Sequence, residues 1–147
     1  MDTKRAWVAV VGAALISSCT GFDATIPEGF AEFDDWFEAR GVSAEGVVFR
    51  VRSEKNEPKA DLAFWREALK KRMLDAGYAL MSESEVKAGE EPGYFLELAA
   101  PVGQQDYTYG VALFIRGSKL VLVEAAGEVT RYAQHRQAIL AAIAKLH

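Results

Sequence analysis

The chain is poor in the residues on which many enzymes and metal sites depend. Its 147 residues include one cysteine, Cys19, and two histidines, His135 and His147. A single cysteine excludes an internal disulfide and a zinc site built on several thiolates. His147 is the last residue, and His135 falls in a predicted helix between Gln134 and Arg136, a setting typical of a solvated face. We therefore expect neither histidine to act as a catalytic base.

A surplus of positive charge is also missing, because the formal net charge is −4. Nucleic-acid binding requires clustered Lys and Arg for phosphate contacts, so an acidic chain is a poor candidate. No glycine-rich phosphate loop and no Gly-x-Ser-x-Gly motif is present. The adjacent carboxylates at residues 34–35 and 90–91 match no calcium loop. The sequence thus predicts no nucleic-acid partner, no metal and no cofactor.

The first 18 residues do carry a clear pattern, that of a secretory signal. Lys4 and Arg5 form a basic start, Ala6–Ile16 is apolar apart from Gly12, and two serines follow. As a helix, the apolar run would reach about 16 Å. A bilayer core is about 30 Å thick, so a permanent membrane span is not expected.

The order Ile16-Ser17-Ser18-Cys19 resembles the lipobox of bacterial lipoproteins. That resemblance implies a diacylglycerol on the Cys19 thiol, cleavage before Cys19, and acylation of the new amino terminus, for example with palmitate. Two or three acyl chains would hold the protein on a membrane lastingly, whereas one holds only marginally. Thr20 and Gly21 follow with no aspartate, as in lipoproteins forwarded to the outer membrane. The alternative is an ordinary secretory signal with a chance cysteine.

The rest of the chain predicts one α+β domain. Residues 1–18 would be the signal peptide, 19–35 a lipidated tether, and 36–147 the domain. A mature chain of about 130 residues buries about two thirds of its unfolded surface. Half of the residues are hydrophobic, so one core is expected rather than global disorder.

Hydrophobic periodicity places the elements. Val47, Phe49 and Val51 alternate with polar residues as in a half-buried strand, whereas residues 62–76 have apolar side chains at helical spacing behind Asp61, a predicted N-cap. The order is ββ-α-β-βββ-α, with hairpin-length connections that favour a largely antiparallel sheet covered by two amphipathic helices. The predicted strands are residues 33–40, 47–54, 78–84, 93–100, 107–116 and 119–126, and the helices are 62–76 and 130–146. For residues 33–40 a helix remains an alternative.

The closing segment at residues 107–143, YTYGVALFIRGSKLVLVEAAGEVTRYAQHRQAILAAI, resembles the end of PsbP-like domains, which include bacterial lipoproteins of the DcrB type. The IPEGF stretch at residues 26–30 is similar to the Pro-x-Gly-aromatic stretch near the start of those domains. The resemblance implies an α/β/α sandwich and a non-enzymatic role in binding or assisting an assembly. The early helix at 62–76 departs from the family pattern.

Basic residues suggest one candidate binding surface. Arg50 and Arg52 share a strand face, and Arg66 and Lys70 lie four apart on the first predicted helix. Together they would form a cationic patch for an anionic partner such as lipid or a wall polymer. The alternative is that these are ordinary solvated charges, paired with residues such as Glu54.

Two functional hypotheses follow. The first is a lipid-anchored, non-catalytic binding or assembly-accessory domain of the bacterial envelope, on the periplasmic side of the outer membrane. Its partner would be an envelope protein, a wall polymer or a small ligand. The second is a small periplasmic hydrolase or isomerase whose carboxylate and hydroxyl groups converge only in three dimensions. A deep pocket with two buried carboxylates would favour the second.

Overall fold

The structure, a computed structural model, describes residues 23–33 and 39–147. The predicted leader, Cys19 and the first part of the predicted tether lie outside the described residues. Within the described part, neither helix has the length and apolar character needed to cross a membrane.

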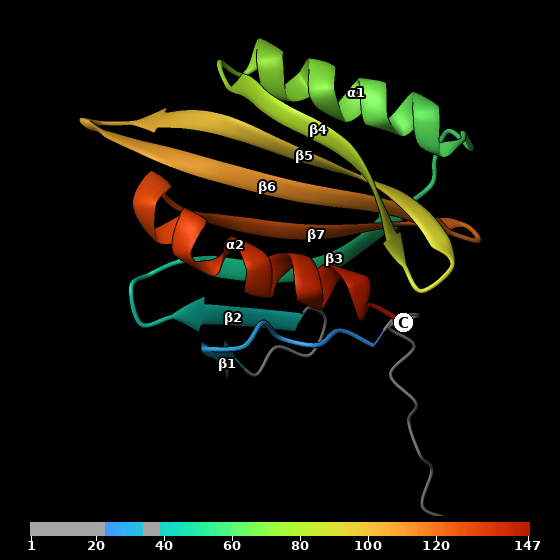
Figure 1. Cartoon of the computed structure of the whole chain (residues 1–147). Coiled ribbons are helices and arrows are strands. Elements are labelled where there is room, and N and C mark those ends of the chain that lie inside the picture. Colours follow the sequence, from blue (N-terminus) through green and yellow to red (C-terminus); the bar gives the residue numbers. More distant parts are fainter. Residues whose placement is uncertain (1–22, 34–38) are drawn as a thin grey trace, which may run out of the picture.

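The chain folds into a seven-stranded antiparallel sheet with a helix on each face (Figure 1). The strand order is β1-β2-β3-β7-β6-β5-β4, and every neighbouring pair is antiparallel. The strands are β1 (Phe30–Phe33), β2 (Ala39–Ser43), β3 (Val48–Lys55), β4 (Ala79–Ala88), β5 (Glu91–Val102), β6 (Gln105–Arg116) and β7 (Lys119–Glu128). The predicted α+β class and largely antiparallel sheet are confirmed.

Helix α1 (Leu62–Asp75) packs on β4, β5 and β6. The Asp61 carboxylate accepts the backbone N–H of Phe64 at 2.9 Å, so the predicted N-cap is confirmed. Gly77 follows the helix with a φ of +93°, a conformation that glycine adopts without the strain a Cβ would bring. The inward side chains pack on buried leucines of the sheet, and they are Leu62, Trp65, Leu69 and Met73.

Helix α2 (Val129–Ala144) covers the opposite face and closes the main core, as Figure 1 shows. Its buried side chains, which include Tyr132, Ile139 and Ile143, pack against phenylalanines and valines of the sheet. This helix was predicted over residues 130–146 and is observed over Val129–Ala144. Its N-cap is Glu128, whose carboxylate accepts the backbone N–H groups of Thr130 and Arg131. Helices on both faces make the domain an α/β/α sandwich.

The β4–β5 hairpin is longer than the sequence pattern predicts. The predicted strands 78–84 and 93–100 leave residues 85–92 as a polar connection, but β4 continues to Ala88 and β5 begins at Glu91. β4 is an edge strand of the sheet. Charged side chains such as Glu83 and Glu85 are common on edge strands because they discourage pairing with other chains. Polar composition alone therefore does not distinguish this edge strand from a turn.

The sheet also begins earlier in the chain than the predicted domain boundary. The segment expected to be a tether, 19–35, contains β1, and Ile26 and Phe30 pack against the main core. Residues 33–40, expected to form one strand, contain the end of β1 and the start of β2. The residues between these strands lie outside the described part.

Candidate binding pocket on the α1 face

The face of the sheet that carries α1 has a pocket beside the helix. α1 packs on β4, β5 and β6, whereas the pocket, of about 540 Å³, lies over β1, β2, β3, β7 and the start of β6. Ten residues line it, and those that the argument uses are Phe33, Val48, Arg40, Arg50, Tyr109 and Glu124.

The backbone register brings these residues into one row. Phe33 lies opposite Arg40, Arg40 opposite Arg50, and Arg50 opposite Glu124 on β7. Cross-strand partners point to the same face of a sheet, so four strands present their side chains to the pocket. Segments that are far apart in the sequence thus contribute to one site.

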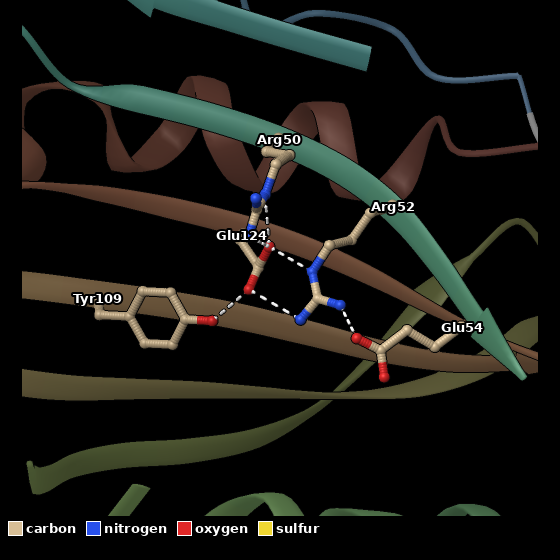
Figure 2. A network of polar contacts seen from close by, with 5 residues as sticks. All are labelled: Arg50, Arg52, Glu54, Tyr109 and Glu124. Atoms are coloured by element: carbon tan, nitrogen blue, oxygen red, sulfur yellow. Dashed lines mark hydrogen bonds and ion pairs between the residues drawn. The ribbon is translucent and has the colours of Figure 1, made fainter. Parts of the chain in front are cut away.

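Glu124 is the centre of the polar network, and Figure 2 shows its partners converging from β3 and β6. Its Oε2 atom accepts hydrogen bonds from Arg50 Nε and Arg52 Nε, both at 2.9 Å, and an ion-pair contact from Arg50 Nη2 at 2.7 Å. Its Oε1 atom accepts the Tyr109 hydroxyl at 2.6 Å and Arg52 Nη2 at 3.3 Å. Arg52 also pairs with Glu54. The Glu124 side chain is 9% exposed, yet both oxygens are satisfied.

The environment fixes the protonation of this network. Burial raises the pKa of Glu124, but the hydrogen bonds from Arg52, Tyr109 and Arg50 outweigh it, so the pKa lies below its ordinary value. Burial and the neighbouring Glu124 carboxylate raise the pKa of Tyr109. At neutral pH the carboxylate is therefore charged and the phenol is a donor. A base whose oxygens are already occupied is poorly placed to take a proton from a substrate, so the arrangement favours binding.

The apolar rim of the pocket is exposed. Phe33 is 55% and Val48 50% accessible, although both are large hydrophobic residues. Arg40 and Arg50 both have interaction partners. The pocket therefore combines an apolar contact surface with a charged floor whose groups already have partners. Such a combination suits a ligand with an apolar group next to a hydrogen-bonding group.

A second buried carboxylate, Glu97, lies on the other face of the sheet. Arg136 Nε and Nη2 contact its carboxylate oxygens at 2.7–3.1 Å, and the hydroxyls of Tyr132 and Ser82 donate to it at 3.1 Å. Burial raises the pKa of Glu97, but Arg136 and Tyr132 outweigh that and hold it below its ordinary value.

Glu97 and Glu124 do not converge on a common site. Glu97 pairs with Gly110 on β6, and Glu124 pairs with the next residue, Val111. Successive strand residues point to opposite faces, so the sheet separates the two carboxylates. The geometry that would have favoured the hydrolase or isomerase hypothesis, two buried carboxylates in one pocket, is not formed by this pair.

The four cations of the predicted patch fall into two groups. Arg50 and Arg52 belong to the Glu124 network described above. Arg66 and Lys70 instead face β4 and β5: the Arg66 guanidinium lies 4.4 Å from the centre of the Tyr94 ring, and Lys70 contacts Glu83 at 3.2 Å.

Helix α1 separates these two groups. The other side of the helix, with Ala68 and Arg72, lines a groove that also contains Arg52 and Leu122 of the sheet. Arg66 and Lys70 both contact Glu67 as well. A single surface formed by all four cations is therefore not seen, and anion binding by either group stays a prediction.

His135 is less solvated than its sequence neighbours suggest. Its ring packs edge-on against Phe30 with centroids 5.2 Å apart, and Nε2 lies 2.8 Å from a Glu45 carboxylate oxygen. Among residues 23–33 and 39–147, no group of three or more His, Cys, Asp or Glu side chains is arranged to hold a metal ion.

Sequence reasoning missed the centre of the pocket. Glu124 is the only charged residue in the apolar stretch 120–127, and that isolation was a usable signal, because a buried carboxylate requires partners. Tyr109 lies in the predicted strand 107–116, whose sequence gives no sign of a contact with Glu124. Nothing in the local sequence around Arg40 or Phe33 links them to Glu124, since the contact depends on the β3–β7 pairing.

No protein-family model and no curated protein matches the chain. Solved structures do share the fold. LpqN, involved in cell envelope biogenesis of Mycobacterium tuberculosis, aligns with a TM-score of 0.69 and 9% identity, over 85% of this chain and 81% of that one. PA94 of Pseudomonas aeruginosa, a protein of unknown function and putative regulator, aligns with a TM-score of 0.63 and 12% identity, over 83% and 81%.

The third similar structure is cyanobacterial PsbP from Synechocystis sp. PCC 6803. It aligns with a TM-score of 0.59 and 14% identity, over 86% of both chains. The resemblance of the closing segment to PsbP-like domains is confirmed at the level of the fold. At these identities the likeness concerns the fold alone.

Proposed function

We propose that the protein is a lipid-anchored, non-catalytic binding domain of the bacterial cell envelope, and that its pocket on the α1 face receives the partner. The observation that carries the proposal is the exposed apolar rim of Phe33 and Val48 above a Glu124 network whose acceptor positions are filled. The lipobox pattern at Cys19 supports the anchor. The fold shared with an envelope-biogenesis protein is consistent with this location.

The chemistry of the pocket restricts the class of partner that it can bind. Its volume of about 540 Å³ lies in the range typical of small-ligand sites. The rim offers contact to an apolar group, while the guanidinium edges and the Tyr109 hydroxyl offer polar contacts at the floor. We expect a ligand or peptide that places an apolar group beside a carboxylate, amide or hydroxyl. We place the protein on the outer membrane, facing the periplasm, as the residues after Cys19 predict.

Site-specific photocrosslinking in intact cells tests the pocket. A benzophenone amino acid in place of Val48 should give a discrete adduct, which mass spectrometry identifies. The same group in place of Phe64 is a matched control, because both residues are 50% exposed and Phe64 lies on α1 outside the pocket lining. Substituting Tyr109→Phe, which removes the hydroxyl, should weaken the Val48 adduct. Equal adduct patterns from both positions would show that the pocket has no specific partner.

The anchor has its own test. Substituting Cys19→Ala should abolish incorporation of labelled palmitate and recovery of the protein with membranes. Mass spectrometry of native material should show an acylated N-terminus at Cys19. An intact, unmodified leader in that measurement would overturn the lipoprotein proposal.

A further inference from the structure

The anchor position constrains how the domain sits on a membrane. Asp23, the first described residue, is four residue steps from Cys19 in the sequence, with three residues between them. Four extended residues span at most about 14 Å, whatever conformation they take. If lipid is attached at Cys19, Asp23 must therefore lie close to the lipid surface.

Asp23 is itself fixed to one end of the sandwich. Its backbone N–H donates to the carbonyl of His147, and the His147 N–H donates back to Asp23 at 3.1 Å. His147 lies three residues after Ala144, the last residue of α2, and the Ala144 carbonyl accepts the N–H of Gly89 in the β4–β5 turn. Figure 1 shows the C-terminus and this hairpin at the same end of the molecule.

The same end holds the β3–α1 loop and the β6–β7 turn. The N–H of Asn56, directly after β3, donates to Ser118 in the β6–β7 turn at 2.9 Å. Lys55 at the end of β3 lies opposite Lys119 at the start of β7. Asp23, His147 and these three connections therefore form one end surface, here called the lysine end.

The lysine end is named for the cations that gather there. These cations are Lys55, Lys59, Lys87, Lys119 and Lys145. None of them has an ion-pair partner among the described residues. Carboxylates lie at this end as well: Asp23 is near His147 and Glu91 pairs with Arg116, whereas Asp61 caps α1 but has no ion-pair partner among the described residues, and neither have Glu57 and Glu90.

The opposite end of the sandwich differs in charge. Its turns, residues 44–47, 76–78 and 103–104, contain no lysine or arginine. The five lysines outnumber the three carboxylates of this end that also lack an ion-pair partner among the described residues, so the end carries a small excess of positive charge although the protein is acidic overall. Lysines near an anionic bilayer surface each strengthen attachment by about fivefold.

We propose that the lysine end is a membrane-docking surface that rests on an anionic lipid bilayer. The proposal rests on the anchor at Cys19 and adds the orientation of the domain. It also gives the distance of the pocket from the bilayer surface. Glu124 lies five strand residues beyond Lys119, about 17 Å from the lysine end. The pocket is thus held clear of the lipid and takes its partner from the aqueous side.

The experiment uses the full-length lipidated protein in phosphatidylcholine–phosphatidylglycerol vesicles that carry a nitroxide on the lipid headgroup. A fluorophore is attached through Ser118→Cys at the lysine end or through Ala44→Cys at the opposite end, both exposed positions. These ends are roughly 25 Å apart along β3. We expect the Ser118 label to lose about half of its fluorescence and the Ala44 label to lose little, because contact quenching is short-ranged compared with that separation.

Because Cys19 is the single native cysteine, thiol labelling tests the proposed lipid anchor separately from the proposed orientation of the domain. With Cys19 acylated, the parent protein has no thiol to label, so labelling of the parent would show that the anchor proposal is wrong. Equal quenching at both positions in a protein that carries palmitate would overturn the orientation alone.

Charge reversal tests the role of the lysines. Substituting Lys119→Glu together with Lys145→Glu should reduce quenching of the Ser118 label, whereas Lys71→Glu, on the exposed side of α1, should not. Circular dichroism of each variant confirms folding. Unchanged quenching in the double variant would show that the lysines do not dock the domain.

Discussion

The side-chain oxygen of Asn56 accepts the indole N–H of Trp65 at 2.6 Å, joining the β3–α1 loop to the inward face of the helix. The same oxygen accepts the N–H of Ala60 at 3.1 Å, and the Asn56 amide donates to the Ala60 carbonyl. Asn56 is buried although it lies in a connecting loop. One amide therefore holds the loop and the start of α1 together.

Substituting Asn56→Ala should destabilise the protein by about 1–3 kcal/mol, because it leaves the part-buried indole N–H of Trp65 without its acceptor. Substituting Asn56→Asp keeps the acceptor oxygen and should be milder. Urea unfolding followed by tryptophan fluorescence measures both. Similar stability for Asn56→Ala and the parent would show that this contact adds nothing to folding.

The ion pair between Glu97 and Arg136 on the α2 face should contribute more to the stability of the fold than a surface ion pair. Substituting Arg136→Ala leaves Glu97 buried without its cation and should lower the free energy of unfolding by about 2 kcal/mol, less than for a fully buried pair because Arg136 is 40% exposed. The matched control is Lys71→Ala, which breaks an exposed pair with Asp75 and should change stability by less than about 0.5 kcal/mol. Equal effects in thermal denaturation would contradict this account.

Acid should destabilise the fold through Glu97 and Glu124. Both have a pKa below the ordinary value of 4.5 in the folded protein. The stability that these two carboxylates contribute is fully present above their ordinary pKa, and it is lost as the pH falls through the lower pKa of the folded protein. The urea concentration at the midpoint of unfolding should therefore decrease once the pH is lowered below 4.5. The double variant Glu97→Gln, Glu124→Gln should show a flatter dependence, and an unchanged slope would exclude these two groups as the cause.

Gly110 leaves room for the Tyr132 hydroxyl. A Cβ at this position would lie 2.2 Å from that oxygen and 3.1 Å from the Phe95 ring. Substituting Gly110→Ala should cost about 1–3 kcal/mol by overpacking. Because the closest atom is the hydroxyl, Tyr132→Phe should be less harmful in the Gly110→Ala background than alone. Strict additivity in a double-mutant cycle of unfolding free energies would refute the steric explanation.

Local patterns predicted most of the framework. The Leu62–Met73 spacing and Asp61 placed α1 to within one residue of its observed bounds, and the Gly117–Ser118 turn was correctly placed between β6 and β7. These features depend on neighbours a few residues apart. β1 and the second half of β4 were missed because edge strands lack the strict alternation of half-buried strands.

The candidate site was less predictable, for a physical reason. Arg50 and Arg52 were singled out as cations, but their partner Glu124 lies more than 70 residues away in sequence. The pairing of β3 with β7 decides that contact, and no local periodicity encodes it. Arg66 and Lys70 were correctly placed on one helix, yet the packing of α1 turns them toward β4 and β5.

The β3–β7 pairing also has a consequence for biosynthesis. The strands β4 to β7 form a continuous meander of hairpins, whereas β1 to β3 attach to the sheet only through β7, one of the last elements to be synthesised. Closing that long loop carries a chain-entropy cost, so joining distant strands is slow compared with forming local hairpins. The N-terminal hairpins must therefore wait, unpaired at one edge, until nearly the whole polypeptide has emerged, and during that interval a chaperone has its best opportunity to bind.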